Sequence, residues 1–166
     1  MKKAYFAGGC FWCIASVFDA IDGVTEVVSG FSGGDEADPT YDDVKTQKTG
    51  HRETVMVSYD EAAVSYAELV SALLSNTDPF DPDGQFIDRG RSYSLAVYYS
   101  DETEKGIAAN ATAELERASG RSVFVALEPF KSFYSAEEFH QNYHKKHPEE
   151  FERELLESGR KDKQRQ

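Results

Sequence analysis

The order of strand and helix signals along the chain constrains its architecture most. Short apolar segments typical of strands alternate with amphipathic helical patterns. The strand signals lie at residues 3–8, 24–31, 53–59 and 94–100, and two helical patterns lie among them at residues 10–21 and 65–76. In chain order they read β-α-β-β-α-β, which is the ferredoxin-like order. We therefore predict an α+β fold with a ferredoxin-like two-layer core.

Further signals extend this core toward the C-terminus. They are a helical pattern at 102–118, a strand signal at 122–127, and weaker helical patterns at 136–146 and 149–158. Two stretches, residues 30–41 and 78–93, are rich in Gly, Pro, Asp and Ser and indicate long loops, which in compact domains are often functional. We expect a single domain over residues 1–158, followed by a polar tail, residues 159–166, that frays.

The chain is acidic, with a formal net charge of −12. Neither nucleic acid nor an anionic membrane attracts such a surface, so we expect neither as a partner. No apolar run reaches the roughly 18 residues that a membrane span needs, and Met1-Lys2-Lys3 leads into a strand too short for a signal peptide. We therefore expect a cytoplasmic protein.

Both cysteines and the only tryptophan lie within four consecutive residues, Cys10-Phe11-Trp12-Cys13. Two neighbouring cysteines in a chain without an export signal are more often redox-active or catalytic than structural. The unpaired N–H groups and the positive dipole end of a helix N-terminus favour a thiolate over a thiol. Since the predicted helix begins at Cys10, this residue is the candidate nucleophile.

Several short motifs follow one another over residues 5–148. They are Gly-Gly-Cys-Phe-Trp-Cys at 8–13, Gly-Phe-Ser-Gly-Gly at 30–34, Pro-Thr-Tyr-Asp-Asp-Val at 39–44, Thr-Gly-His-Arg-Glu at 49–53, Val-Ser-Tyr-Asp at 57–60, Asp-Pro at 78–79, Gly-Gln-Phe-Ile-Asp-Arg-Gly at 84–90, Tyr93, and Glu-Glu-Phe-His-Gln-Asn-Tyr at 137–143. In this order the set resembles the A-type peptide methionine sulfoxide reductases. A lone Cys-x-x-Cys would be weak evidence, whereas the ordered set covers nearly the whole chain.

The resemblance implies an enzyme that reduces methionine S-sulfoxide, free or in proteins, without a cofactor. Cys10 would attack the sulfoxide sulfur and take over its oxygen, which leaves methionine and a sulfenic acid on Cys10. Glu53 matches the family's catalytic acid, and burial in an apolar pocket would keep it protonated. Tyr93 matches a tyrosine that donates a hydrogen bond to the oxygen, and Asp88 matches a polar residue that organises the site. By spacing alone, Glu53 would be a solvated charge, Tyr93 a core or rim residue, and Asp88 a turn former.

Phe11 and Trp12 separate the two cysteines, where a general thiol–disulfide exchanger more often carries small residues. The resemblance implies that their rings hold the methyl group on the substrate's sulfur. The alternative is that both belong to the core of an amphipathic helix. Phe31 occupies a substrate-binding position where family members commonly carry tyrosine, so one hydroxyl for the sulfoxide oxygen is absent. Stabilisation of this oxygen would then depend on Glu53 and Tyr93.

Cys13 is the candidate resolving cysteine, because the C-terminal cysteines that many family members use for recycling are missing. Residues three apart on a helix have Cβ atoms roughly 5–6 Å apart and a disulfide needs about 4 Å, so a modest rearrangement would join Cys10 to Cys13. The alternative is that Cys13 is a small buried apolar residue. The resemblance implies thioredoxin as the external reductant, and we expect a monomer.

Three histidines, His140, His144 and His147, have a spacing that can place metal ligands on one helix face. Two lysines lie between them, a proline follows, and no cysteine is near in sequence, so we expect no metal site. The resemblance places His140 in a motif beneath the site, where it would orient site residues. We expect His51, close to Glu53 in sequence, to fix the geometry of a loop.

Two other classes of function remain open from the residues alone. A dithiol–disulfide exchange protein built on Cys-x-x-Cys would act on protein disulfides and would need no acid at Glu53. A non-catalytic module would use the aromatic residues to recognise methionine, with the cysteines as packing residues.

Overall fold

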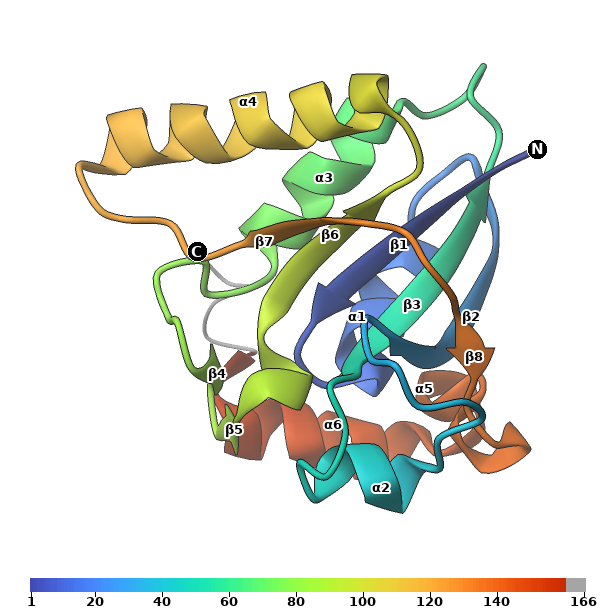
Figure 1. The fold of residues 1–166 in the computed structure, drawn as a ribbon. Helices are drawn as coiled ribbons and strands as arrows, with labels where there is room; N and C mark the ends of the chain where they lie inside the picture. The colour runs from blue at the N-terminus through green and yellow to red at the C-terminus, as the bar shows by residue number, and fades with distance from the viewer. Residues whose placement is uncertain (161–166) are drawn as a thin grey trace.

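A six-stranded sheet forms the centre of the protein in a computed structural model that describes residues 1–160 (Figure 1). In spatial order its strands are β7 (Ala126–Pro129), β6 (Leu95–Tyr99), β1 (Lys2–Gly8), β3 (Arg52–Tyr59), β2 (Val24–Ser32) and β8 (Tyr134–Ser135). The four inner strands β6-β1-β3-β2 are each antiparallel to their neighbours. Because the β-α-β-β-α-β chain order produces this arrangement, the predicted ferredoxin-like core is confirmed.

Two helices cover one face of this sheet and enclose the main core. Helix α1 (Phe11–Asp19) connects β1 to β2, and α3 (Tyr66–Ser75) lies between β3 and β6 in the chain. Helix α4 (Glu102–Ser119) packs on α3 (Figure 1). The core between sheet and helices includes Ala4, Phe6, Val55, Val57 and Val97 from the strands and Ile14, Phe18, Leu69, Val70 and Leu73 from the helices.

The opposite face of the sheet is covered by a C-terminal segment. Side chains alternate along a strand, so Tyr5 of β1 points away from the helices, between the core residues Ala4 and Phe6. The Tyr5 ring stacks on Phe130 at a centroid distance of 3.9 Å. Phe130 belongs to the segment that leaves β7 at one edge of the sheet and reaches β8 at the other (Figure 1). The predicted C-terminal extension therefore adds a strand at each edge.

The prediction of one helix over residues 136–146 is wrong. This stretch contains a 3₁₀ turn, Glu138–His140, followed by the short helix α5 (Tyr143–Lys146). Asn142 between them adopts a left-handed conformation with φ of 54°, which asparagine tolerates better than most residues, and this conformation interrupts the helix. The Gln141 side chain also bonds both backbone groups of a residue of β2, so the segment follows the sheet edge.

The remaining elements lie close to their predicted positions. Helix α6 (Pro148–Ser158) matches the predicted 149–158, whereas β7 begins later than the predicted 122–127. Short elements occur after or within the predicted loops: α2 (Tyr41–Lys45), the hairpin of β4 (Gly84–Gln85) and β5 (Asp88–Arg89), and a 3₁₀ turn, Arg91–Tyr93. No helix within residues 1–160 is long and apolar enough to cross a membrane.

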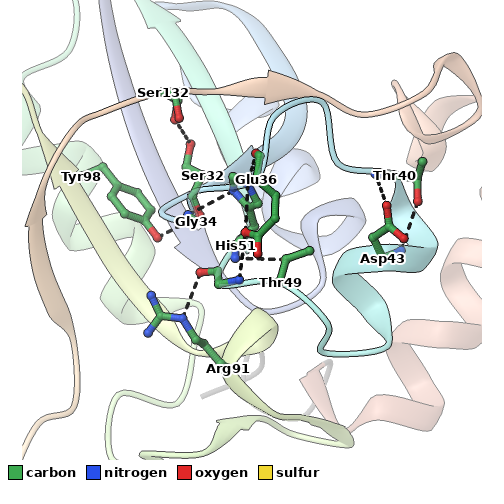
Figure 2. A network of polar contacts seen from close by, with 11 residues as sticks. Ser32, Gly34, Glu36, Thr40, Asp43, Thr49, His51, Arg91, Tyr98 and Ser132 are labelled. Atoms are coloured by element: carbon green, nitrogen blue, oxygen red, sulfur yellow. Dashed lines mark hydrogen bonds and ion pairs between the residues drawn. The ribbon is translucent and has the colours of Figure 1, made fainter.

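His51 holds the loop that connects β2 to α2 (Figure 2). Its buried ring accepts a hydrogen bond from the backbone N–H of Gly34 at Nδ1 (3.2 Å), and its Nε2 lies 2.8 Å from the carbonyl oxygen of Glu36. Since a carbonyl only accepts, Nε2 carries the proton and the ring is neutral. At the end of this loop, Thr40 and Asp43 form a reciprocal capping box that starts α2. The His51 ring thus connects two backbone groups of this loop, and its role in support of the site stays a prediction.

The predicted start of the polar tail, at residue 159, is too early. Arg160 is 1% exposed, and its Nη2 donates a hydrogen bond to the carbonyl oxygen of Gly8 (2.7 Å), so the chain is still packed at this residue. The rest of the predicted tail, residues 161–166, lies outside the described residues.

Candidate active site

Cys10 and Glu53 line one cavity of about 260 Å³ at the N-terminal end of α1. Four other residues predicted for the site line the same cavity: Trp12, Cys13, Asp88 and Tyr93. They come from α1, β5 and the following 3₁₀ turn, so the fold brings together residues that are far apart in sequence. A larger open groove of about 690 Å³ lies elsewhere, lined in part by β7, and contains neither cysteine.

The two cysteines form a hydrogen-bonded pair. Cys10 is the N-cap residue of α1 and partly exposed, whereas Cys13 is 3% exposed. The hydrogen bond with Cys13 and burial raise the pKa of Cys10, whereas the same hydrogen bond lowers the pKa of Cys13. The two thiols therefore titrate as a pair that loses its first proton more easily than its second.

No backbone N–H at the start of α1 bonds the side chain of its N-cap residue, Cys10. The backbone N–H of Phe11, the first in the helix, donates its hydrogen bond to Oε1 of Glu53 (3.1 Å). The backbone N–H groups of Cys13 and Ile14 both donate to the carbonyl oxygen of Cys10. The helix N-terminus therefore supplies no hydrogen bond to the Cys10 sulfur, and stabilisation of a thiolate by the helix dipole stays a prediction.

Glu53 is a buried carboxyl group with one free oxygen. It lies on β3 opposite Phe31 of β2, and it is 1% exposed. Burial and the neighbouring Cys10 raise the pKa of Glu53 well above its usual value, although the hydrogen bond from Phe11 opposes this shift. Its Oε2 has no hydrogen-bond partner among residues 1–160. Burial therefore favours the protonated form of this carboxyl group, which is held at one oxygen and available to a ligand at the other.

Two tyrosines accompany this carboxyl group. Tyr93, predicted from the sequence, is 9% exposed and lines the cavity. Tyr41, the first residue of α2, lines it as well, and sequence reasoning missed it. Burial and the charge of Glu53 raise the pKa of both phenols, so both remain hydrogen-bond donors. The available signal for Tyr41 was its place in the Pro-Thr-Tyr motif at 39–41.

Of the three aromatic residues predicted to bind substrate, only Trp12 lines the cavity. Its indole N–H donates to Nδ1 of His140 (3.2 Å), and its ring stacks on Tyr143 at a centroid distance of 4.0 Å. Phe11 and Phe31 are 1% and 0% exposed and pack against each other at a centroid distance of 5.7 Å. Neither side chain lines the cavity, both belong to the main core, and for Phe11 the alternative of a core position describes it better.

The three histidines near the C-terminus have separate partners. Because an indole N–H only donates, Nδ1 of His140 is unprotonated, and burial lowers the pKa of this ring, so it is neutral. His144 lies 3.3 Å from a carboxylate oxygen of Asp19, and His147 packs on Tyr143. Within the described part of the chain, no group of three or more His, Cys, Asp or Glu side chains is arranged to hold a metal ion.

Helix α6 borders the cavity and supplies residues that sequence reasoning missed. Glu154 and Glu157 line the cavity together with Asp88, whose pKa is raised by burial. Arg160, just after the helix, lowers the pKa of Asp88 and of both cysteines. No motif marks these residues, because the sequence of α6 is that of an ordinary charged amphipathic helix, and only its packing determines which face meets the cysteines.

The chain is similar to known proteins over most of its length. A family model described as peptide methionine sulfoxide reductase matches residues 2–166. The peptide methionine sulfoxide reductase MsrA of Listeria monocytogenes is 42% identical over 163 residues, which cover 96% of this chain and 92% of that protein. The structure of methionine sulfoxide reductase A of Corynebacterium diphtheriae matches with a TM-score of 0.79 and 30% identity, covering 89% of this chain and 75% of the other. Mxr1 from Saccharomyces cerevisiae in reduced form matches with a TM-score of 0.84 and 26% identity, covering 89% and 86%.

Proposed function

The chain belongs to the peptide methionine sulfoxide reductase family, and we propose that it reduces methionine S-sulfoxide, free or in proteins, to methionine. The observation that carries this proposal is the cavity shared by Cys10 and Glu53, in which a thiol pair lies beside a buried carboxyl group with a raised pKa and one free oxygen. Sulfoxide oxygen leaves poorly as a bare anion, so a nucleophile and an acid must act on the same S–O bond.

In the first step, a thiolate on Cys10 attacks the sulfoxide sulfur while Glu53 gives its proton to the oxygen. The S–O bond breaks and the oxygen is transferred to Cys10, which leaves methionine and a sulfenic acid. Tyr41 and Tyr93 donate hydrogen bonds to the oxygen as it gains charge, and the ring of Trp12 contacts the methyl group on sulfur. Phe11, which we expected to share that contact, acts through the backbone N–H that orients the acid.

In the second step, Cys13 attacks the sulfur of the sulfenic acid, an S–S bond forms, and the oxygen leaves as water. The hydrogen bond between the two cysteines supports this assignment, because the attacking sulfur already lies beside its target. An external dithiol then reduces the disulfide and restores both thiols. We infer thioredoxin for this task, since yeast Mxr1, whose fold this chain shares, is known in a complex with Trx2.

The separate S and R epimers of a blocked methionine sulfoxide test the proposal. In the presence of thioredoxin, thioredoxin reductase and NADPH, the purified protein should reduce only the S epimer, and Cys10→Ser should reduce neither. Rapid reduction of insulin disulfides without turnover of either epimer would identify a general dithiol–disulfide exchange protein instead. Peptide binding that survives Cys10→Ser, in a wild type that reduces neither epimer, would identify a non-catalytic binding module.

Tyr41→Phe should lower kcat/KM for the S-sulfoxide by about tenfold to a hundredfold, because a hydrogen bond to a charged group contributes roughly 1.5–3 kcal/mol. Thermal stability should stay close to that of the wild type. Tyr66→Phe is the matched control, since it removes a buried hydroxyl that lines a different cavity and has no partner among residues 1–160. Steady-state kinetics of both variants provide the measurement. Equal kcat/KM for Tyr41→Phe and wild type would remove Tyr41 from the site.

We also propose a monomer that acts in the cytoplasm. All residues assigned to the site lie between Cys10 and Arg160 in or beside one cavity, which supports a single catalytic domain. The cycle needs reduced cysteines, which a reducing compartment maintains. Asp88 keeps its proposed organising role, because it lines the cavity and both Arg160 and Lys45 act on its pKa.

A further inference from the structure

Arg160 is a buried cation to which the reaction above assigns no role. Its side chain is enclosed, and Nη2 donates a hydrogen bond to the carbonyl oxygen of Gly8 (2.7 Å). Its Nε has no hydrogen-bond partner among residues 1–160. The guanidinium carbon lies 4.9 Å from the centre of the Phe86 ring, in the β4–β5 hairpin. Arg160 thus connects the end of α6 to two segments that border the active site.

The charge of Arg160 has no carboxylate partner in the described part of the chain, where no ion pair involves this residue. Arg52, another buried arginine, is paired with Glu128 at 2.8 Å. Burial of an uncompensated charge is strongly unfavourable, because the protein interior solvates it much less well than water. A compensating anion is therefore expected close to Arg160.

The position of Arg160 identifies this anion. The guanidinium occupies the space beside Gly9, where an added Cβ would overlap Nη2, and Gly9 directly precedes Cys10. The positive charge lowers the pKa of Cys10, Cys13 and Asp88 alike. Asp88 forms no ion pair with Arg160 and burial favours its neutral form, whereas the cysteine pair begins directly after Gly9, on which the guanidinium packs, so the pair is the candidate anion.

We propose that Arg160 is the counter-ion of the thiolate that forms within the Cys10–Cys13 pair. Arg160 is a positioning residue: it touches neither substrate nor oxygen, and it holds the negative charge next to the end of β1. The role in turnover rests on the proposed function, whereas the ion pair is a property of the reduced protein alone. When the disulfide forms, the thiolate disappears and Arg160 loses its partner, so Arg160 also makes the disulfide easier for an external dithiol to reduce.

The pH dependence of alkylation tests this proposal. The reduced protein is treated with iodoacetamide between pH 6 and pH 10, and mass spectrometry follows the modification of Cys10. Arg160→Met should slow alkylation at pH 7 by about tenfold and leave the rate at pH 10 nearly unchanged, because only the thiolate reacts. The equilibrium of its disulfide with glutathione should shift tenfold toward the oxidised form, which corresponds to about 30 mV. In Arg160→Lys, both the alkylation rate at pH 7 and the equilibrium with glutathione should return close to the wild-type values.

Arg153→Met is the matched control, because Arg153 is an exposed arginine on the same helix, and its pH profile should superimpose on that of the wild type. The proposal is overturned if folded Arg160→Met titrates like the wild type, or if Arg160→Lys is as slow as Arg160→Met. Sulfoxide reduction plays no part in these measurements. A protein that shows the expected titration but reduces neither epimer would therefore overturn the proposed function and leave the ion pair standing.

A measurement on the unsubstituted protein covers the case in which Arg160→Met does not fold. A thiol with a depressed pKa in the folded state contributes stability above that pKa, and the disulfide form has no such group. The free energy of unfolding of the reduced form should therefore rise relative to the disulfide form between pH 6 and pH 8. A constant or falling difference would show that no stabilised thiolate exists beside Arg160.

Discussion

Replacing Cys13 with serine should leave one round of sulfoxide reduction per enzyme molecule and abolish turnover driven by thioredoxin. Cys10 keeps its N-cap position and Glu53 keeps its hydrogen bond from Phe11, so the first chemical step keeps its nucleophile and its acid. The chain contains no further cysteine, so the sulfenic acid cannot become an internal disulfide. The steady-state rate with thioredoxin should therefore fall to below about one-hundredth of the wild-type rate.

Rapid-quench experiments measure this separation directly. They should yield close to one methionine per enzyme molecule in the first turnover, and a sulfenic-acid reagent should label Cys10 in the product. Cys13→Ala is the companion variant, because Cys13 is 3% exposed in an apolar cluster with residues of α5 and α6, where a serine hydroxyl is poorly accommodated. If both variants behave alike, the loss comes from the missing thiol. Full thioredoxin-driven turnover in either variant would remove the resolving role of Cys13.

The core of the fold could be predicted because local patterns and chain order agree. Ala4 and Phe6 face the helices while Tyr5 faces away, which is the period of two that a half-covered strand requires. Ser65 precedes a regular amphipathic pattern and caps α3 by accepting a hydrogen bond from the backbone N–H of Glu68. The helix predicted at 136–146 failed because apolar spacing does not reveal the conformation of single residues such as Asn142.

The site could be predicted where it consists of motifs and not where it depends on tertiary packing. Cys10 and Glu53 meet because β1 and β3 are antiparallel neighbours in the ferredoxin-like order. The end of β1, which Cys10 follows, therefore lies beside the start of β3, which carries Glu53. Tyr41 lines the cavity whereas Phe31 does not, and Tyr41 follows a loop whose path no local pattern determines. Arg160 lies far from Gly8 in sequence, so only the folded chain reveals its contact with the carbonyl oxygen there.

Glu53→Gln should lower kcat/KM for the S-sulfoxide by at least about a hundredfold, since it removes the proton that the departing oxygen needs. Glutamine has nearly the same size as glutamate, and its carbonyl oxygen still accepts the hydrogen bond from the backbone N–H of Phe11. Glu104→Gln is the matched control. It alters another buried glutamate whose pKa burial raises, but Glu104 lines a different cavity, so its replacement should leave the kinetics unchanged.

Stability should move in the opposite direction to activity in Glu53→Gln. The pKa of Glu53 in the folded state lies above its unfolded value, so its contribution to stability is complete below the unfolded pKa and is lost as pH rises through the folded pKa. Glutamine does not titrate. Denaturant unfolding should therefore show similar stability of variant and wild type near pH 5, and a growing advantage of the variant toward pH 9. A variant that is less stable at every pH would mean that the carboxyl group has a structural role instead.

The pH profile of kcat/KM separates the acid from the nucleophile. The active protein needs one ionised sulfur and one protonated carboxyl group, and a charge on Cys10 makes Glu53 harder to ionise. Activity should fall at low pH because the thiol pair regains its proton, and at high pH because Glu53 loses its own. Glu53→Gln should retain the low-pH fall and lose the high-pH fall. If the high-pH fall persists at the same midpoint in the variant, the second proton of the cysteine pair causes it, and another group supplies the acid.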